Sequence, residues 1–184
     1  MNVIFKRRAG LLTIMMLILI LSGCGYTNKS LVAPDASTIF VKTFENKIDI
    51  TKETSTRQKF AVYKPFLEIK VTDSIVNRII FDGNFNIVGE DSADLSLEGE
   101  VTNYLRQPVK YADSKDVLEY RLNLVINFIL KDLRTGKVLL EEKNLTADTS
   151  YFVTGNFAKS EDKALDELLE DLSRRVTSRI VNRW

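Results

Sequence analysis

The sequence predicts an α+β fold, a two-layer sandwich with two helices packed on one face of a four-stranded mixed sheet. Apolar and polar residues alternate along residues 93–105 and 120–130, which is the pattern of strands with one buried face. Apolar residues recur at helical spacing along 66–81 and 160–182. The expected element order is β-α-β-β-β-α, and one-sided strands and helices bury their apolar faces by stacking in two layers.

The composition removes several classes of function. Among 184 residues, 26 Lys and Arg balance 25 Asp and Glu. The sequence therefore lacks the excess of positive charge that is typical of nucleic-acid-binding proteins. There is no histidine, and Cys24 is the one cysteine, which excludes histidine-based catalysis, histidine metal ligands and cysteine zinc sites. Adjacent carboxylates such as Glu90-Asp91 and Glu161-Asp162 do not face each other, so we interpret them as solvated surface. We expect a protein that is not an enzyme and that holds neither metal nor cofactor.

Residues 1–23 have the order of a signal peptide of the lipoprotein type. Lys6, Arg7 and Arg8 precede an apolar run, and eleven residues at about 1.5 Å each cannot cross a hydrocarbon core of about 30 Å. The run ends in Leu21-Ser22-Gly23-Cys24, which resembles the lipobox of bacterial lipoproteins. The resemblance implies cleavage before Cys24 and a lipid anchor on its thiol. Glycine rather than aspartate at the next position favours the outer membrane.

Residues 24–37 are mostly small or polar, and we expect them to form the lipidated N-terminus and a tether. Residues 38–184 would form the periplasmic domain. Its first strand is predicted at Thr38–Phe44, a run of β-branched and aromatic residues. Residues 45–64 are charged and lack a clear period, so they predict a loop, with a short extended piece at 60–63.

A helix is predicted from Phe66 to Phe81, because apolar residues recur every four positions. Pro65 before it and Gly83 after it fit the punctuation of a helix. The strand that opens at Ala93 is expected to lose its regular pairing at Gln107-Pro108, because proline has no backbone donor.

The strand at 120–130 leads into a turn at 132–137, where Gly136 suits a left-handed backbone position. The chain returns as a strand from Val138 to about Tyr151. The last element is a helix from about Ser160 to Asn182, acidic in its first half and basic in its second, an order that suits the helix macrodipole.

Several short patterns occur in a fixed order along the chain. They are Cys24-Gly25-Tyr26, the strand 39–44 followed by Glu45-Asn46, the segment 93–99, Pro108-Val109 with Tyr111, Tyr120-Arg121, Asp132 with Thr135-Gly136-Lys137, and a terminal helix ending at Trp184. Together they resemble the lipopolysaccharide-assembly lipoprotein family, LptE, over nearly the whole mature chain.

The resemblance implies a periplasm-facing, lipid-anchored protein of the outer membrane that plugs the LptD β-barrel and helps to assemble it. It also implies assistance in delivering lipopolysaccharide to the outer leaflet. Two other functions stay open at this point. One is a lipoprotein that binds peptidoglycan or activates a cell-wall synthase, and the other is a pilotin-like factor for secretin assembly.

Two small basic groups are candidate contacts with lipopolysaccharide or with the inner wall of the barrel. Lipopolysaccharide carries phosphates, which Arg and Lys bind by charge-assisted hydrogen bonds. The alternative is that these side chains belong to solvated turns. The first group surrounds the turn at 132–137 and the second lies near the end of the strand from Ala93: Lys131, Arg134 and Lys137, then Arg106 and Lys110.

Val125 and Ile129 interrupt the polar face of the strand at 120–130. An apolar pair there fits contact with a partner, and it fits equally well cover from the loop at 45–64, since isolated apolar residues are common on surfaces. On the opposite face, Leu124 and Ile126 are expected to face the last helix at Leu168 and Leu172.

Overall fold

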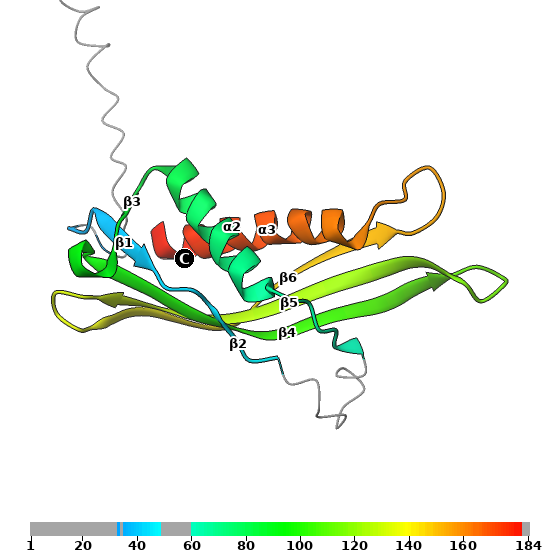
Figure 1. The fold of residues 1–184 in the computed structure, drawn as a ribbon, viewed down its shortest axis with the longest axis horizontal. Helices are drawn as coiled ribbons and strands as arrows, with labels where there is room; N and C mark the ends of the chain where they lie inside the picture. Colours follow the sequence, from blue (N-terminus) through cyan, green and yellow to red (C-terminus); the bar gives the residue numbers. More distant parts are fainter. Residues whose placement is uncertain (1–32, 34, 49–59, 182–184) are drawn as a thin grey trace, which may run out of the picture.

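A computed structural model of the chain describes residues 33, 35–48 and 60–181. These residues form an elongated two-layer α+β structure in which both helices lie on the same side of a mixed sheet (Figure 1). The predicted fold class and the position of the helices on one face are therefore confirmed. The predicted number of strands is wrong, because the sheet has six strands instead of four.

The strand order is β3-β1-β4-β5-β6, with β2 paired to β4. The short strands run parallel to one another and to β4, whereas β4, β5 and β6 form two antiparallel hairpins. The elements in chain order are β1 (Thr38–Val41), β2 (Glu45–Asn46), α2 (Leu67–Asp82), β3 (Asn86–Ile87), the 3₁₀ helix η2 (Glu90–Ser92), β4 (Leu95–Tyr111), β5 (Val117–Asp132), β6 (Val138–Phe152) and α3 (Glu161–Val181).

Two short segments account for the extra strands. The single strand predicted at 38–44 is divided into β1 and β2, and β3 adds a parallel edge strand beside β1. A segment of two residues gives no measurable period, so the alternation of side chains could not reveal β2 or β3. In the predicted loop, the extended piece at 60–63 pairs at one position, where Ala61 bridges Leu105.

β4 continues through Pro108 to Tyr111, but its regular pairing with β5 ends at Pro108, as predicted. Pro108 stands opposite Tyr120, with irregular register on either side of Lys110. The strand itself tolerates the proline because β4 has few neighbours on its other side here. Among the described residues, that side is paired no further along the strand than Leu105, so the missing proline donor faces no ladder and costs little.

Local sequence signals mark the C-terminal end of α2, the start of α3 and the turn at 132–137. Gly83 ends α2 in the left-handed conformation, with φ of 71°, and its N–H donates to the Ile79 carbonyl over 3.1 Å. The Ser160 hydroxyl accepts from the Lys163 N–H over 3.3 Å at the start of α3. Gly136 has φ of 68°, as expected for its turn. Within the described ranges, neither helix is long and apolar enough to span a bilayer.

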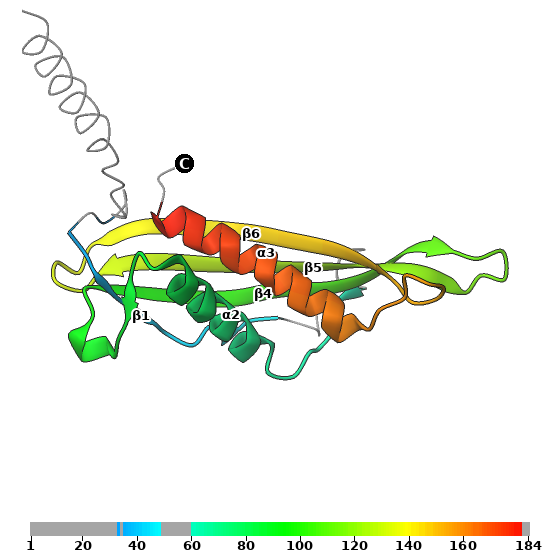
Figure 2. The ribbon, with the colours of Figure 1, turned by 90° about the horizontal axis from the view of Figure 1, so that it is seen from above.

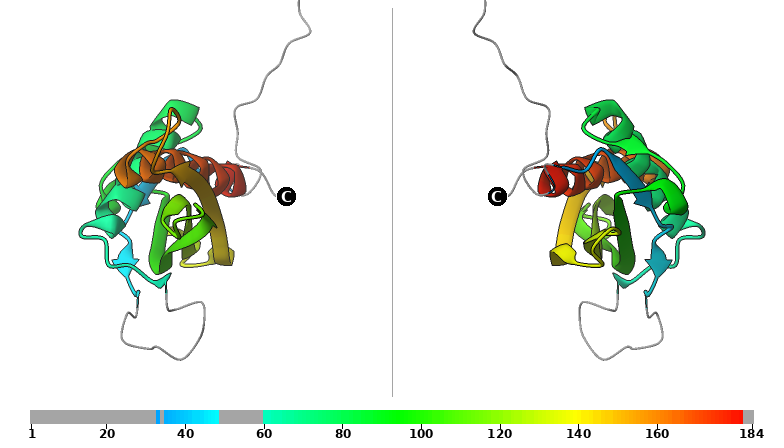
Figure 3. Two further views of the ribbon diagram at one scale, coloured as in Figure 1. Left: turned by 90° about the vertical axis from the view of Figure 1, so that its right-hand side faces the viewer. Right: turned by 90° about the vertical axis from the view of Figure 1, so that its left-hand side faces the viewer.

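Both helices lie over the long strands (Figure 2), and the buried apolar side chains of the helices and the sheet form one core cluster. Leu124 and Ile126 of β5 and Leu168 and Leu172 of α3 are at most 1% exposed, and all four belong to one core cluster. Polar side chains of the three long strands lie on the opposite face, which we call the helix-free sheet face. An end-on view shows the sheet curved, with α2 and α3 over one face (Figure 3).

The elongated shape separates two ends of the molecule. The β5–β6 end contains the turn at 132–137, the start of β1 and the last turns of α3, whereas the β4–β5 end contains the turn at 111–117, which projects past α3 (Figures 1 and 2). The long strand β5 therefore places these two turns at opposite ends of the molecule.

Candidate functional site

The five basic residues singled out in the sequence do not form one site. Lys131, Arg134 and Lys137 lie at the β5–β6 end, whereas Arg106 and Lys110 lie towards the β4–β5 end. A phosphate could bind only those N–H donors of each group that are not already paired within the chain.

Lys131 is committed to a carboxylate of its own sheet. Its Nζ lies 2.9 Å from both carboxylate oxygens of Glu98 on the neighbouring strand β4, and both side chains are about one-third exposed. A cross-strand ion pair of this kind satisfies the ammonium group locally. Lys131 is therefore the weakest of the three turn candidates for binding an outside anion.

Arg134 lies between two carboxylates. Its Nε is 3.5 Å from Asp132 Oδ1 and 4.0 Å from Asp94 Oδ1, and its side chain is half exposed. The backbone N–H groups of Arg134 and Thr135 donate to Asp132 Oδ1 over 2.8 and 3.2 Å. Burial raises the pKa of Asp132, but these donors outweigh it and hold the pKa below its usual value. Two charged carboxylates thus offset the positive charge of Arg134.

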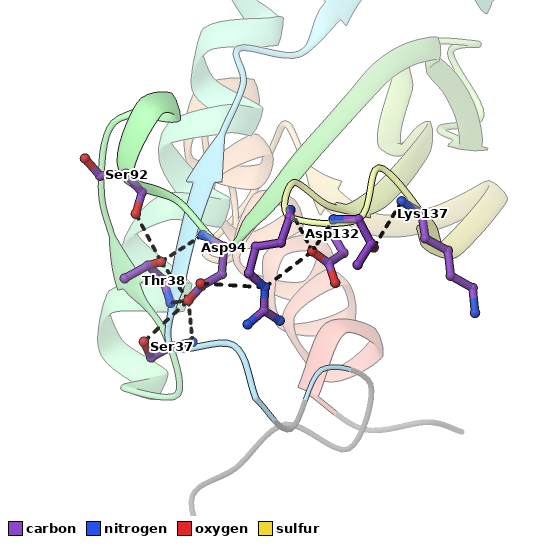
Figure 4. Close-up of polar contacts among 8 residues, drawn as sticks. Ser37, Thr38, Ser92, Asp94, Asp132 and Lys137 are labelled. Carbon is purple, nitrogen blue, oxygen red and sulfur yellow. Dashed lines mark hydrogen bonds and ion pairs between the residues drawn. The ribbon is translucent and has the colours of Figure 1, made fainter.

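Asp94 joins this turn to the start of β1 (Figure 4). Its Oδ2 accepts from the Ser37 N–H at 2.9 Å, the Thr38 N–H at 3.1 Å and the Thr38 hydroxyl at 2.9 Å, and its own N–H donates to Thr38 Oγ1. The backbone donor of Ser37, followed by those of Thr38, holds the pKa of Asp94 below its usual value. The Asp94 carboxylate therefore has a structural role, because it holds the start of β1 against the start of β4.

Lys137 differs from its two neighbours. It is exposed, and Figure 4 shows its side chain directed away from Asp94. Within the described residues it makes no ion pair, and its backbone N–H contacts the Thr135 hydroxyl at 3.4 Å. Lys137 is thus the residue of the turn whose ammonium group remains available to an anion.

Arg106 takes part in a half-buried cluster at the start of α3. Its Nη1 lies 2.7 Å from Glu161 Oε2, and its guanidinium stacks 5.1 Å from the centroid of the Tyr120 ring. The buried Tyr104 hydroxyl donates to Glu161 Oε1 over 3.0 Å. Burial, followed by the nearby charge of Glu161, raises the pKa of Tyr104. Arg106 therefore pins α3 to β4, and it is largely unavailable to a ligand.

Glu161 corrects one sequence prediction. Its side chain is 18% exposed and accepts from Arg106 and Tyr104, so it is not the solvated surface carboxylate that the Glu161-Asp162 pair predicted. Asp162 fits that prediction better, being two-thirds exposed and paired with Lys64 at 2.8 Å. No local spacing in the sequence marks Glu161, because Tyr104 and Arg106 lie more than 50 residues away from it along the chain.

Lys110 lies on the exposed end of β4. Its Nζ is 6.0 Å from the centroid of the Phe152 ring, and it makes no ion pair with the residues that the structure describes. Together with Lys137, it is one of two predicted contact residues whose charge is not paired within the described chain, and these two lie at opposite ends of the sheet.

The helix-free sheet face carries a shallow hollow of about 300 Å³ between β2, β4, β5 and β6. Val125 and Ile129 on this face are partly exposed, so the described residues leave the apolar pair partly uncovered. Residues 49–59 of the loop that could cover it lie outside the described residues. Carboxylates dominate the lining of the hollow, with two lysines among them: Glu45, Glu98, Glu100, Glu141 and Glu142, then Lys42 and Lys143.

Among the described residues, no group of three or more potential metal-ligating side chains comes together. Cys24, the expected lipid attachment site, lies outside the described residues. The charged side chains that the structure brings together, at Asp94 and at Glu161, join separate segments of the fold.

The comparisons with known proteins agree with this fold. The family model LptE, described as lipopolysaccharide-assembly, matches residues 36–184. A protein from Xanthomonas campestris has a TM-score of 0.57 at 14% identity, over 80% of this chain and 88% of that one. An uncharacterized lipoprotein B from Nitrosomonas europaea has a TM-score of 0.54 at 9% identity, over 86% and 88%. At these identities the two structures show likeness of fold alone. None of the curated proteins compared with the chain matched it.

Proposed function

The chain belongs to the LptE family of lipopolysaccharide-assembly proteins, and from this premise we propose that it is a non-enzymatic, lipid-anchored subunit of the outer-membrane machinery that delivers lipopolysaccharide to the outer leaflet. Its partner in this proposal is the LptD β-barrel, which it plugs and helps to assemble. The described residues act in this role by presenting a surface.

The observation that carries the proposal is the helix-free sheet face. It combines polar side chains with the partly exposed apolar pair Val125 and Ile129 on strands that run the length of the molecule. A polar face suits the wet interior of a barrel, whereas a lipid-facing surface would need a continuous apolar band. Obligate partners usually bury more than about 2,000 Å², and a long sheet face offers an extended area for such contact.

Co-purification tests the proposal. The full chain, carrying an affinity tag and isolated from outer membranes in mild detergent, should bring with it a large β-barrel protein. Depleting the chain should lower the amount of assembled barrel and of lipopolysaccharide at the cell surface. Recovery of a murein synthase or a secretin in place of a barrel would contradict the proposal and favour one of the two other functions.

The lipid anchor rests on Cys24 and on the order of residues before it. Mass spectrometry of the purified protein should find an N-terminal acylated cysteine and no residues 1–23. A chain that keeps Met1, or a mature cysteine without acyl groups, would contradict the anchor. One acyl chain gives only marginal membrane binding, so stable anchoring requires two or more.

Lys137 and Lys110 are the proposed contacts with lipopolysaccharide phosphates, because their charges are not paired within the described chain. Replacing Lys137 by Glu should weaken binding of purified lipopolysaccharide, since attraction to phosphate becomes repulsion. Arg134 is the matched comparison. Arg134→Glu, with the same reversal of charge, should weaken binding less, because Asp94 and Asp132 already offset the charge of Arg134. Equal binding by the Lys137→Glu variant and the unaltered protein would rule out contact at this turn.

A further inference from the structure

A hollow between the second half of α3 and strand β6 has a lining unlike that of the sheet hollow described above. It measures about 480 Å³, and no carboxylate is among its five lining residues, which are Leu145, Arg174, Arg175, Ser178 and Arg179. We propose that this α3–β6 hollow binds a phosphate group. The inference rests on the chemistry of the lining residues and does not depend on the proposed function.

Two arginines of the hollow share one carboxylate. Arg174 Nη2 lies 2.6 Å from Asp171 Oδ1, and Arg175 Nε lies 2.7 Å from Asp171 Oδ2, so one carboxylate serves two guanidinium groups. Burial raises the pKa of Asp171, but the hydrogen bonds from both arginines hold it below its usual value, which keeps the carboxylate charged. At least one positive charge therefore remains without an acidic partner in the Asp171 group.

The donors are arranged for a compact anion. A guanidinium group has five N–H donors, and Arg175 uses one on Asp171 and one on the Thr146 carbonyl at 3.4 Å. Arg175 and Arg179 are one helical turn apart on α3, so their Cβ atoms lie about 5–6 Å from each other. The planar fork of arginine matches phosphate oxygens, and the Ser178 hydroxyl supplies a further donor.

The wall opposite the arginines is apolar. Leu145 of β6 lines the hollow and is 8% exposed, so it brings little water to the site. Carboxylates distinguish the sheet hollow, lined by Glu141 and Glu142, and a hollow between α2 and α3, lined by Asp166 and Glu170, from the α3–β6 hollow.

Two sources of phosphate share the chemistry that this hollow would recognise. The hollow lies on the part of α3 nearest the β5–β6 end, beside the strand β6 (Figure 2). The phosphate could belong to the head group of a lipid or be free in solution, and the recognition chemistry is the same. Arginines near the end of a helix also offset its macrodipole without any ligand, and the experiment has to separate that role from binding.

Titration of the full chain with two soluble probes tests the proposal, with the ¹⁵Nε signals of Arg174, Arg175 and Arg179 followed by NMR at constant ionic strength. One probe is inorganic phosphate, and the other is glycerophosphoglycerol, the soluble head group of phosphatidylglycerol. Saturable shifts of these signals support the site. Tighter binding of the first probe indicates free phosphate as the source, and tighter binding of the second indicates a lipid head group. Absence of saturation with both probes would overturn the proposal.

Three variants separate binding from helix stabilisation. Arg175→Gln should weaken phosphate binding about fivefold or more, because it removes a charged donor. Asp171→Asn should tighten binding about two- to fivefold, because it removes the competing carboxylate. Arg121→Gln, which removes an exposed arginine of β5 outside the hollow, is the matched control and should change nothing. A folded Asp171→Asn protein that binds no tighter would overturn the proposal, since a purely structural set of arginines predicts no gain.

Discussion

Asp94 fixes the start of β1 to the start of β4, because three donors from Ser37 and Thr38 converge on one of its oxygens. Asp94→Asn replaces the charged acceptor by a neutral amide. Since hydrogen bonds to charged groups contribute about 1.5–3 kcal/mol each and the amide oxygen keeps part of this, we expect a loss of about 1–3 kcal/mol in the free energy of unfolding at pH 7. Urea unfolding measures it, and Asp113→Asn in the exposed β4–β5 turn is the control.

The same carboxylate predicts a pH dependence. The folded pKa of Asp94 is lowered, so its contribution is complete above the unfolded pKa of about 3.9 and is lost as pH falls through the folded value. The gap in unfolding free energy between the unaltered protein and Asp94→Asn should therefore narrow below about pH 4. A gap that stays constant from pH 7 to pH 3 would mean that the charge of Asp94 contributes nothing.

Contacts with residues distant in sequence explain why position 99 has no side chain. A Cβ built on it would lie 2.3 Å from Phe44 Cε1 and 2.8 Å from the Asn127 carbonyl oxygen, and Phe44 is 1% exposed. Gly99→Ala should therefore destabilise the fold by about 1–3 kcal/mol through overpacking. Gly89→Ala is the matched control, because no atom lies within 4 Å of its Cβ position. Adding Phe44→Leu should recover part of the loss in a double-mutant cycle, and no recovery would exclude this ring as the cause.

At the scale of the elements, the sequence predicts well those helices and strands that are long enough to repeat their apolar period several times. The bounds of α2, β5 and α3 agree with prediction to within about three residues, because each carries several repeats of its own period. β2 and β3 have two residues each, and parallel pairing with a distant strand defines them. The same limit applies to the candidate contacts. The basic residues were visible in the sequence, but the carboxylates Glu98 and Glu161 that neutralise two of them were identifiable only in the folded sheet.

The helix layer can be tested at one buried position. Leu168 lies on the apolar stripe of α3 and is fully buried in the core cluster that it shares with Leu124 and Ile126. Leu168→Ala should cost about 2–5 kcal/mol of unfolding free energy, because it leaves a cavity between α3 and the sheet. Asp166→Ala, on the exposed side of the same helix, should change stability by less than about 0.5 kcal/mol. A Leu168→Ala loss below about 0.5 kcal/mol would contradict the observed packing.

For the molecule as a whole, the two sheet faces and the two ends differ in how much of their surface is already covered or paired within the chain. The helices cover one sheet face and supply the core, whereas the described residues leave the other face open along the full length of β5. At the two ends, most of the predicted basic residues are bound to the chain's own carboxylates. The open face is therefore the larger surface available to a partner, and its apolar pair is the place to test it.

Ile129 distinguishes a partner from cover by the loop. It stands opposite Glu98 on β4 and Glu141 on β6, so Ile129→Lys places a cation between two carboxylates and the sheet should accommodate it. If a barrel packs on this face, the variant should lose about tenfold or more in barrel recovery, as an apolar anchor in an interface does. Its unfolding free energy should then change by less than about 1 kcal/mol. If residues of the 45–64 loop cover Ile129 instead, the lysine would be buried beneath them, stability would fall and barrel recovery would stay unchanged in the protein that still folds. Glu170→Gln on the exposed side of α3 changes the net charge by the same single positive unit and should leave both measurements unaltered.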